Sequence, residues 1–195
     1  MVRILLLFAI VSQAISQTAL KSVIENDRVA VWDVAEPPTA RPFDAVVVSL
    51  SLPGAASFLP RNTASEDSGP KVTDSKIAAR YVVIDLKDHP VTPIANTSGY
   101  PLAFPRPGSK KILENARVIV WDYTWTPGMA TPMHFHDKDV VVVYLEDGDL
   151  KSTTPDGKAT VNSYQFGMVR FNLRDRVHTE TLIRGNQHAI ITELK

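Results

Sequence analysis

Three of the five histidines in this 195-residue sequence have a spacing that would let them bind one metal ion. His134 and His136 are two residues apart at the start of an apolar run, so a β-strand there would point both imidazoles to the same face of a sheet. His178 lies on a later run, which an adjacent strand would bring alongside. Three imidazoles with open positions for water or substrate would form a site for Zn, Fe, Mn, Ni or Cu.

The segments that carry these histidines are predicted to be β-strands. Val, Ile, Tyr and Trp are dense in them, and no stretch has a helical period long enough to compete. Asp147-Gly148 and the segment 154–157 have the residue types of turns. We therefore expect an all-β fold of short strands in a sandwich or barrel. The expected strands of the second half are 118–125, 139–145, 168–173, 177–183 and 188–194.

The sequence contains an internal repeat. Residues 25–33 recur as 114–122, with seven of nine positions identical, and residues 45–50 align with 140–145. Four further identities at a common offset pair Lys71, Thr73, Leu86 and Asp88 with Lys158, Thr160, Leu173 and Asp175. We interpret the chain as a tandem duplication with halves at 17–105 and 106–195.

Two stretches of the second half resemble the motifs of the cupin superfamily, G(x)5HxH(x)3–4E(x)6G and G(x)5PxG(x)2H(x)3N. The matching residues are Gly128, His134, His136 and Gly148 in the first, and Gly167 and His178 in the second. The resemblance implies a jelly-roll barrel (a double-stranded β-helix) for each half, with a divalent metal bound by the three histidines at the barrel mouth of residues 106–195. With the duplication, it implies two tandem cupin-type barrels, a bicupin.

The second half departs from the family pattern at the glutamate of the first motif. Val140 and Val141 stand where that metal-binding glutamate would be, and Asp139 is the nearest carboxylate. Strand alternation alone places Asp139 on the face opposite His136, so it would need a β-bulge to become a ligand. Its other interpretation is a turn or salt-bridge carboxylate. The second motif is also eroded, with Leu173, Asp175 and Leu182 in place of its Pro, Gly and Asn.

The first half has lost the histidines. In the repeat alignment, Thr39 and Arg41 stand opposite the HxH pair, and Val91 stands opposite the third histidine. We therefore predict that residues 17–105 form a degenerate cupin-like barrel. The Trp-Asp pair at 32–33 is kept in this half, which indicates a structural role for the pair rather than a catalytic one.

The composition and the N-terminal residues limit which partners and which cellular location we expect for the protein. Lys and Arg together number 21, as do Asp and Glu, so the chain lacks the positive excess of a nucleic-acid binder. Cysteine is absent, which excludes disulfides and thiolate ligands. Arg3, an apolar run at 4–11 and a small-residue site at 14–16 predict a signal peptide over residues 1–16. We expect a periplasmic or extracellular protein that leaves the membrane after cleavage.

Three functions remain open for the second half. A metal on three histidines would serve a dioxygenase or isomerase type of enzyme, whose general acid or base would be Asp139 or Tyr144. Alternatively, the barrel is a non-catalytic module for a metal or small molecule, or a structural bicupin with a vestigial site. Arg170, Tyr144, Asn172 and Gln165 are the other candidates to line the barrel. Open sheet edges predict a homodimer.

Overall fold

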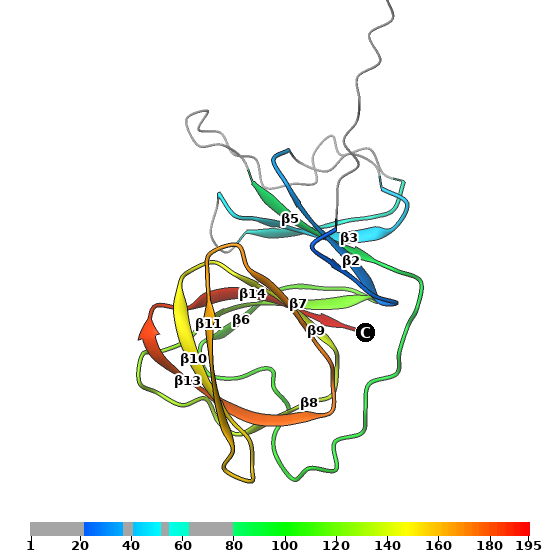
Figure 1. Ribbon diagram of the computed structural model, residues 1–195. Helices are drawn as coiled ribbons and strands as arrows, with labels where there is room; N and C mark the ends of the chain where they lie inside the picture. Colours follow the sequence, from blue (N-terminus) through cyan, green and yellow to red (C-terminus); the bar gives the residue numbers. More distant parts are fainter. Residues whose placement is uncertain (1–21, 37–40, 52–54, 63–79) are drawn as a thin grey trace, which may run out of the picture.

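The structure is a computed structural model that describes residues 22–36, 41–51, 55–62 and 80–195. The predicted signal peptide at 1–16 lies outside these residues. Within them the regular structure consists entirely of β-strands, arranged in three antiparallel sheets (Figure 1). This agrees with the all-β prediction. No helix long and apolar enough to cross a membrane occurs in these ranges.

One sheet, which we call the N-terminal sheet, comes from the first half of the chain and has the strand order β1-β2-β5-β3-β4. The second half forms the other two sheets, which we call the C-terminal barrel. Their strand orders are β11-β10-β13-β8 and β12-β9-β14-β7-β6. The strands of the N-terminal sheet are β1 (Ile24–Glu25), β2 (Val29–Val34), β3 (Asp44–Ser49), β4 (Ala56–Leu59) and β5 (Tyr81–Leu86).

The strands of the C-terminal barrel are β6 (Ser109–Glu114), β7 (Val118–Thr124), β8 (His134–His136), β9 (Val140–Tyr144), β10 (Gly148–Thr153), β11 (Ala159–Tyr164), β12 (Val169–Asn172), β13 (Arg176–Gly185) and β14 (His188–Leu194). All five strands expected in this half are present. Strands β6, β10 and β11 were not predicted, because polar residues interrupt their apolar alternation and much of their surface faces solvent.

The N-terminal sheet packs face to face on the five-stranded sheet of the barrel (Figure 1). Valine, isoleucine and leucine side chains from both sheets fill the space between them, among them Val31 and Ile84 from one and Val120 and Ile190 from the other. A second, more aromatic core fills the barrel interior, with Trp121, Tyr123 and Trp125 on one wall. Burying these faces removes apolar surface from water, which is the main favourable contribution in a chain without disulfides.

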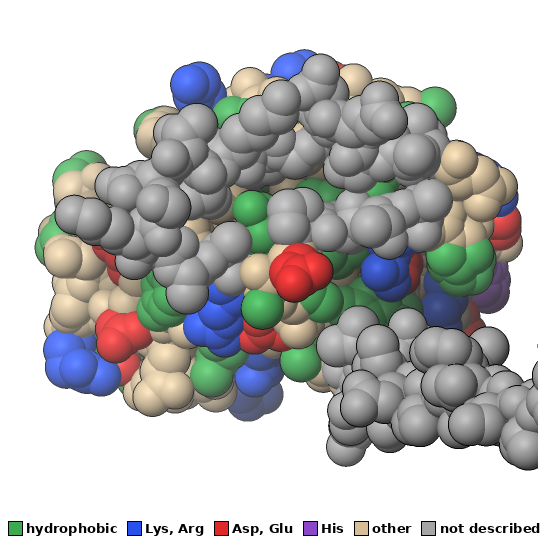
Figure 2. All heavy atoms as spheres, turned by 90° about the horizontal axis from the view of Figure 1, so that it is seen from above, with side chains coloured by type: hydrophobic (Ala, Val, Ile, Leu, Met, Phe, Trp, Pro, Cys, Tyr) green, Lys and Arg blue, Asp and Glu red, His purple; other side chains and the backbone are tan. Residues whose placement is uncertain are grey.

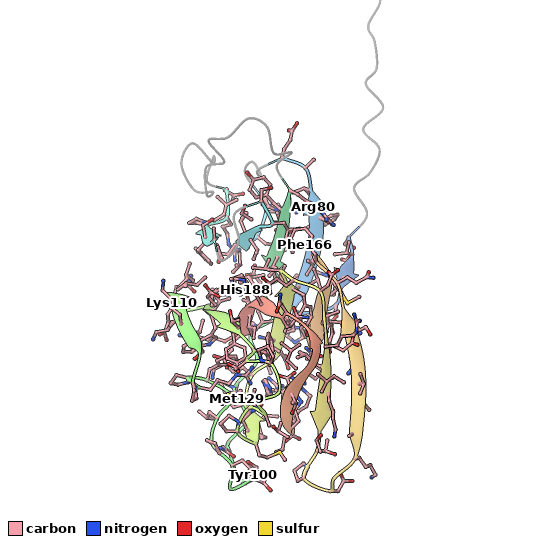
Figure 3. The ribbon with its side chains drawn as sticks, turned by 90° about the vertical axis from the view of Figure 1, so that its left-hand side faces the viewer. Arg80, Tyr100, Lys110, Met129, Phe166 and His188 are labelled. Atoms are coloured by element: carbon pink, nitrogen blue, oxygen red, sulfur yellow. The ribbon has the colours of Figure 1, made fainter. Side chains whose placement is uncertain are left out.

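The N-terminal sheet and the histidine-bearing strand lie at different ends of the molecule. Figure 3 shows Arg80 and Phe166 close together where the N-terminal sheet meets the barrel, and Tyr100 at the opposite end of the barrel. Figure 2 looks onto the N-terminal sheet, where acidic and basic side chains of described residues are interspersed with apolar ones. The histidine-bearing strand β8 lies in the barrel wall away from this sheet (Figure 1).

The N-terminal sheet has the strand order of the five-stranded barrel sheet, with β5 in the place of β14. In the ladders, Trp32 pairs with Val83 and Trp121 pairs with Ile191. Both indole Nε1–H groups donate to a buried carboxylate on the central strand, Trp32 to Asp85 at 2.7 Å and Trp121 to Glu193 at 2.8 Å. The repeated tryptophans therefore have the same structural contact in both halves.

Two arginines make reciprocal contacts between the halves. Arg28 of the first half forms an ion pair with Asp139 of the second at 2.6 Å, and Arg117 of the second forms one with Asp44 of the first at 3.1 Å. Each guanidinium also donates to a backbone carbonyl oxygen of the other half. The same surfaces thus face each other in both directions, as in a two-fold interface.

The ladders correct one part of the sequence alignment. Leu86 ends β5, whose place corresponds to β14, so its counterpart by strand order and register is Leu194 rather than Leu173. Val91 lies outside the strands and is therefore not the counterpart of His178. Four scattered identities specify an alignment less well than a hydrogen-bonded register does. Thr39 lies outside the described residues, and Arg41 forms an ion pair with Asp85 at 2.5 Å.

Gly148, a residue of the first cupin-like motif, lies where β10 passes close to another backbone segment. A Cβ atom at this position would lie 2.4 Å from the carbonyl oxygen of Asn186. We expect Gly148→Ala to lower the free energy of unfolding by about 1–3 kcal/mol, measured by urea titration, because backbone must move. Gly157→Ala, in an open turn at φ +81°, is the comparison for a glycine without a close contact. It should lower the free energy of unfolding by about 1–2 kcal/mol through added backbone strain alone. Equal stability of Gly148→Ala and the wild type would contradict this packing argument.

Candidate metal centre

Strands β8 and β13 bring the three histidines together. In their antiparallel ladder His134 pairs with His178, so these two side chains point to the same side of the sheet. His136 points to that side too, because side chains two residues apart on a strand share a face. The Nε2 atom of His136 is 3.2 Å from that of His134 and 3.1 Å from that of His178. All three side chains are buried. The three side chains therefore converge, as the sequence predicted.

Hydrogen bonds orient two of the rings. Nδ1 of His134 lies 2.7 Å from the carbonyl oxygen of Pro132, which can only accept, so Nδ1 carries the proton. Nδ1 of His178 lies 3.1 Å from the hydroxyl of Ser152. A proton on Nδ1 leaves the Nε2 lone pair of His134 directed into the cluster. The three Nε2 atoms lie close enough to share one ion, and imidazole nitrogen is a ligand that first-row metals accept. The donor set therefore fits a metal ion.

The cluster disfavours protonated histidine. Burial, followed by the positive charge of Arg106, lowers the pKa of His134 to about 3. Burial, followed by Arg176 and Arg106, lowers the pKa of His178 to about 3. Burial also lowers the pKa of His136 well below its ordinary value. The three rings are therefore neutral near pH 7, which is the form that binds metals.

These pKa shifts predict a pH effect on the metal-free protein. In the unfolded chain the histidines take up protons as the pH falls below about 6.5, whereas the folded protein resists this until about pH 3, so folding stability is lost as the pH falls. At pH 5 the loss should be about 2 kcal/mol for each of His134 and His178 relative to pH 7. Urea unfolding after chelation measures it. A triple variant with Asn at positions 134, 136 and 178 should lose correspondingly less stability between these pH values, and an equal loss would contradict the prediction.

The structure places Asp139 away from the histidines. Its carboxylate accepts from Arg28 at 2.6 Å and from the backbone N–H of Arg174 at 2.8 Å, at the contact between the two halves. It is not part of the histidine cluster. Val140 and Val142, which follow it on β9, line the cavity beside the histidines instead. The salt-bridge interpretation of Asp139 thus matches its position.

Asp175 shows how the eroded second motif keeps its backbone shape. The motif has glycine at this position, and Asp175 has a φ of +61°. Aspartate is one of the few side chains that adopts this left-handed region at modest cost. Its N–H donates to the carbonyl oxygen of His136 at 2.8 Å, which ties the entry of β13 to β8. The replacement of glycine by aspartate therefore leaves the strand that carries His178 in place.

A cavity of about 130 Å³ opens beside the cluster inside the barrel. His136 and His178 line it, together with three arginines and one carboxylate, which are Arg106, Arg170, Arg176 and Glu180. Tyr144 and Asn172, named from the sequence as possible lining residues, also face it, whereas Gln165 is exposed and does not. Burial raises the pKa of Tyr144 well above its ordinary value, so its hydroxyl remains a hydrogen-bond donor.

Arg106 connects the cavity to the histidines. Its NH1 atom is 3.1 Å from Nε2 of His134, and its NH2 atom is 3.5 Å from Oε2 of Glu180. The guanidinium carbon lies 4.0 Å from the ring centroid of Tyr123 and 5.7 Å from that of Trp125, within cation–π range. These contacts hold a buried positive charge next to the proposed ligands.

Arg106, Arg176 and Glu180 were not among the candidate residues predicted from the sequence. A signal existed for two of them, because positions 176, 178 and 180 alternate along one strand and must share the face of His178. Arg106 lies in a loop between two prolines. A loop has no regular alternation of side chains, so the sequence does not show which of its residues point into the barrel. The place of Arg106 depends on the segment 101–104, where Leu102 forms a parallel bridge with Phe135 of β8.

Comparisons with known proteins cover parts of the chain. No family model matches it. A curated relative, the β-alanine degradation protein BauB of Pseudomonas aeruginosa, is 47% identical over 45 residues, which make up 23% of this chain and 47% of that protein. The match thus spans about half the length of the curated relative.

Solved structures with similar chains include a cupin domain from Bordetella pertussis Tohama I, with 26% identity and a TM-score of 0.41 over 47% of this chain and 97% of that one. A cupin 2 conserved barrel domain protein from Leptotrichia buccalis matches over 90% of this chain and 88% of its own, with 12% identity and a TM-score of 0.48.

Proposed function

We propose that this chain, which belongs to the cupin superfamily, holds a divalent first-row metal ion on His134, His136 and His178 and uses it on a small molecule in the adjoining cavity. The observation that carries the proposal is the convergence of three buried Nε2 atoms. Zn, Fe, Mn, Ni and Cu all accept such a donor set. Metal analysis of the purified protein tests it, and about one ion per chain is the expected result.

When bound, the metal would supply Lewis acidity or a redox centre to a small oxygenated substrate. The chain would supply the remaining groups. Oε2 of Glu180 accepts from the indole N–H of Trp125 at 3.2 Å and belongs to the single carboxylate among the described cavity residues, so it is the candidate to accept or return a proton. The hydroxyl of Tyr144, which shares a hydrogen bond with the side chain of Tyr164, would exchange that partner to donate to the substrate. Asp139 has no part in this chemistry.

An enzyme of the dioxygenase or isomerase type is the form of this function that we favour, because ionisable groups line a cavity next to the donor set. The name of the partial relative adds small amino acids and their breakdown products to the substrates worth testing. Oxygen uptake and product formation should be measured with catechols, flavonols, keto acids, sugars and β-alanine. Turnover that requires the metal would support an enzyme.

A non-catalytic binding or structural bicupin is the second candidate. It is favoured by one observation, that no carboxylate of the described residues joins the three histidines. Full metal occupancy without turnover of any compound in the panel would favour a binding module. Negligible metal would favour a vestigial site.

We also propose that the halves are tandem copies and that the first is a degenerate cupin. The shared strand order, the equivalent Trp–carboxylate contacts and the reciprocal arginine pairs support this. The bounds 17–105 and 106–195 stay a prediction. Residues 101–106 already contribute to the barrel, through the Leu102 bridge and through Arg106.

Secretion and dimerisation are proposals from the sequence. N-terminal sequencing of the exported protein tests cleavage after Ser16, which is expected to leave a periplasmic or extracellular product. Light scattering tests the homodimer. A product that keeps residues 1–16, or a strict monomer in solution, would contradict the respective proposal.

A further inference from the structure

The cavity beside the histidines carries an excess of positive charge. Arg106, Arg176 and Glu180 line it together with Arg170, whose side chain is exposed to solvent, so with neutral histidines the lining has a formal charge of +2 before any metal binds. A divalent ion would add to that charge. A positive site with low-dielectric walls attracts anions and repels cations, and it adds no comparable attraction for a neutral ligand of the same shape.

Arg176 has unused binding capacity in this cavity. Its Nε–H donates to the carbonyl oxygen of Leu173, and the described residues give its two terminal nitrogens no hydrogen-bond or ion-pair partner. The residue is partly buried and pairs in the ladder with His136, which places it next to the cluster. Glu180 is the nearest favourable charge for this guanidinium, but no hydrogen bond or ion pair joins the two side chains. An anion that enters the cavity would give the terminal nitrogens the direct partners that the described residues do not.

Arg106 adds a second donor at the same place. Its Nε atom is buried and has no hydrogen-bond partner, while its NH1 atom faces Nε2 of His134. Glu180, 3.5 Å away, neutralises only part of the local charge. Planar guanidinium groups bind the two oxygens of a carboxylate well, because their N–H donors match its geometry.

From these contacts we infer that the natural ligand of the cavity is a small carboxylate, which Arg176 and Arg106 bind next to the three histidines. The inference deepens the proposed metal-dependent function and rests on it. The cavity of about 130 Å³ is close to the size of engineered cavities that hold benzene, about 150 Å³, so a ligand of a few carbon atoms fits. Propionate is therefore a suitable probe, and propionamide is its neutral counterpart of nearly the same shape.

Calorimetric titration of the full chain with propionate and propionamide tests the inference. We expect propionate to bind at least about 10-fold more tightly than propionamide, since only the carboxylate forms charge-assisted bonds. Arg176→Gln should weaken propionate binding by about 10- to 100-fold and leave propionamide binding unchanged. Arg184→Gln is the matched control, because Arg184 lies on the same strand, is exposed and pairs with Asp149 outside the cavity.

The titrations are run with and without added zinc, and zinc content is measured in every variant. Equal affinity for acid and amide, or wild-type propionate affinity in Arg176→Gln, would overturn the carboxylate inference even in a zinc-loaded protein. A chain that binds no zinc but prefers propionate through Arg176 would instead contradict the metal proposal and leave the carboxylate site standing. The two failures are therefore distinguishable.

Discussion

His136→Ala should lower the affinity for a first-row divalent metal by more than about 100-fold. Loss of a hydrogen bond to a metal ligand already costs about 10- to 100-fold, and this substitution removes a ligand atom itself. His136 lies between the other two histidines, with its Nε2 atom about equally far from theirs, so no neighbouring imidazole can replace it. Metal content after dialysis, and titration with zinc, would show the effect.

His89→Ala is the matched control for this substitution, because His89 is exposed in the first half and takes no part in the cluster. It should keep the metal content of the wild type. Circular dichroism must show that His136→Ala retains its β-structure, and His136→Gln serves as a second variant if it does not. Equal metal content in the wild type and in folded His136 variants would contradict the proposed centre.

Asp139→Ala should lower the free energy of unfolding by about 3–5 kcal/mol without reducing metal content. The carboxylate is almost fully buried and pairs with a guanidinium that is 10% exposed, so its removal leaves a buried positive charge uncompensated. The histidine cluster does not include Asp139, and its three donor atoms should remain in place. Urea unfolding measures the first effect and metal analysis the second.

Two further variants distinguish this interpretation of Asp139 from a general sensitivity of the fold. Asp156→Ala removes an exposed pair with Lys158 and an exposed hydrogen bond from the Thr154 hydroxyl, and it should cost no more than about 1–2 kcal/mol. A double variant, Arg28→Met with Asp139→Leu, should recover part of the lost stability, since both charges are gone, while the backbone N–H of Arg174 still lacks its acceptor. The salt-bridge interpretation would be contradicted if Asp139→Ala were within about 1 kcal/mol of the wild type in stability, or if this variant lost its metal.

Some elements were predictable because their signal is local. The strands that carry Val118, Val140 and His188 are runs of β-branched or aromatic residues, and the pair at 134 and 136 must share a face in any strand. Strands β10 and β11 escaped prediction because polar residues interrupt their apolar alternation. Leu150 packs in the barrel core, but Ser152 and Asn162 line the cavity. A hydrophobic period cannot reveal a strand whose inward face is partly hydrophilic.

The repeat was visible in the sequence, but its third block was misaligned. Leu86 matched Leu173 by identity, whereas the ladder puts β5 in the place of β14. The kept contact, an indole N–H to a buried carboxylate, joins Trp32 to Asp85 across the sheet. The equivalent contact in the second half joins Trp121 to Glu193. Because one half has aspartate and the other glutamate, a search for identical residues does not detect this shared contact.

The β-strands and the three imidazoles that can meet follow from the amino-acid order, because strand alternation and motif spacing depend on nothing else. The pairing of Asp139 with Arg28, and the presence of Arg106, Arg176 and Glu180 around the histidines, depend on how the chain folds. Ion pairs and cavity walls form only where particular strands become neighbours. The choice of neighbours is made by burying apolar faces over long sequence separations, not by any residue's local preference.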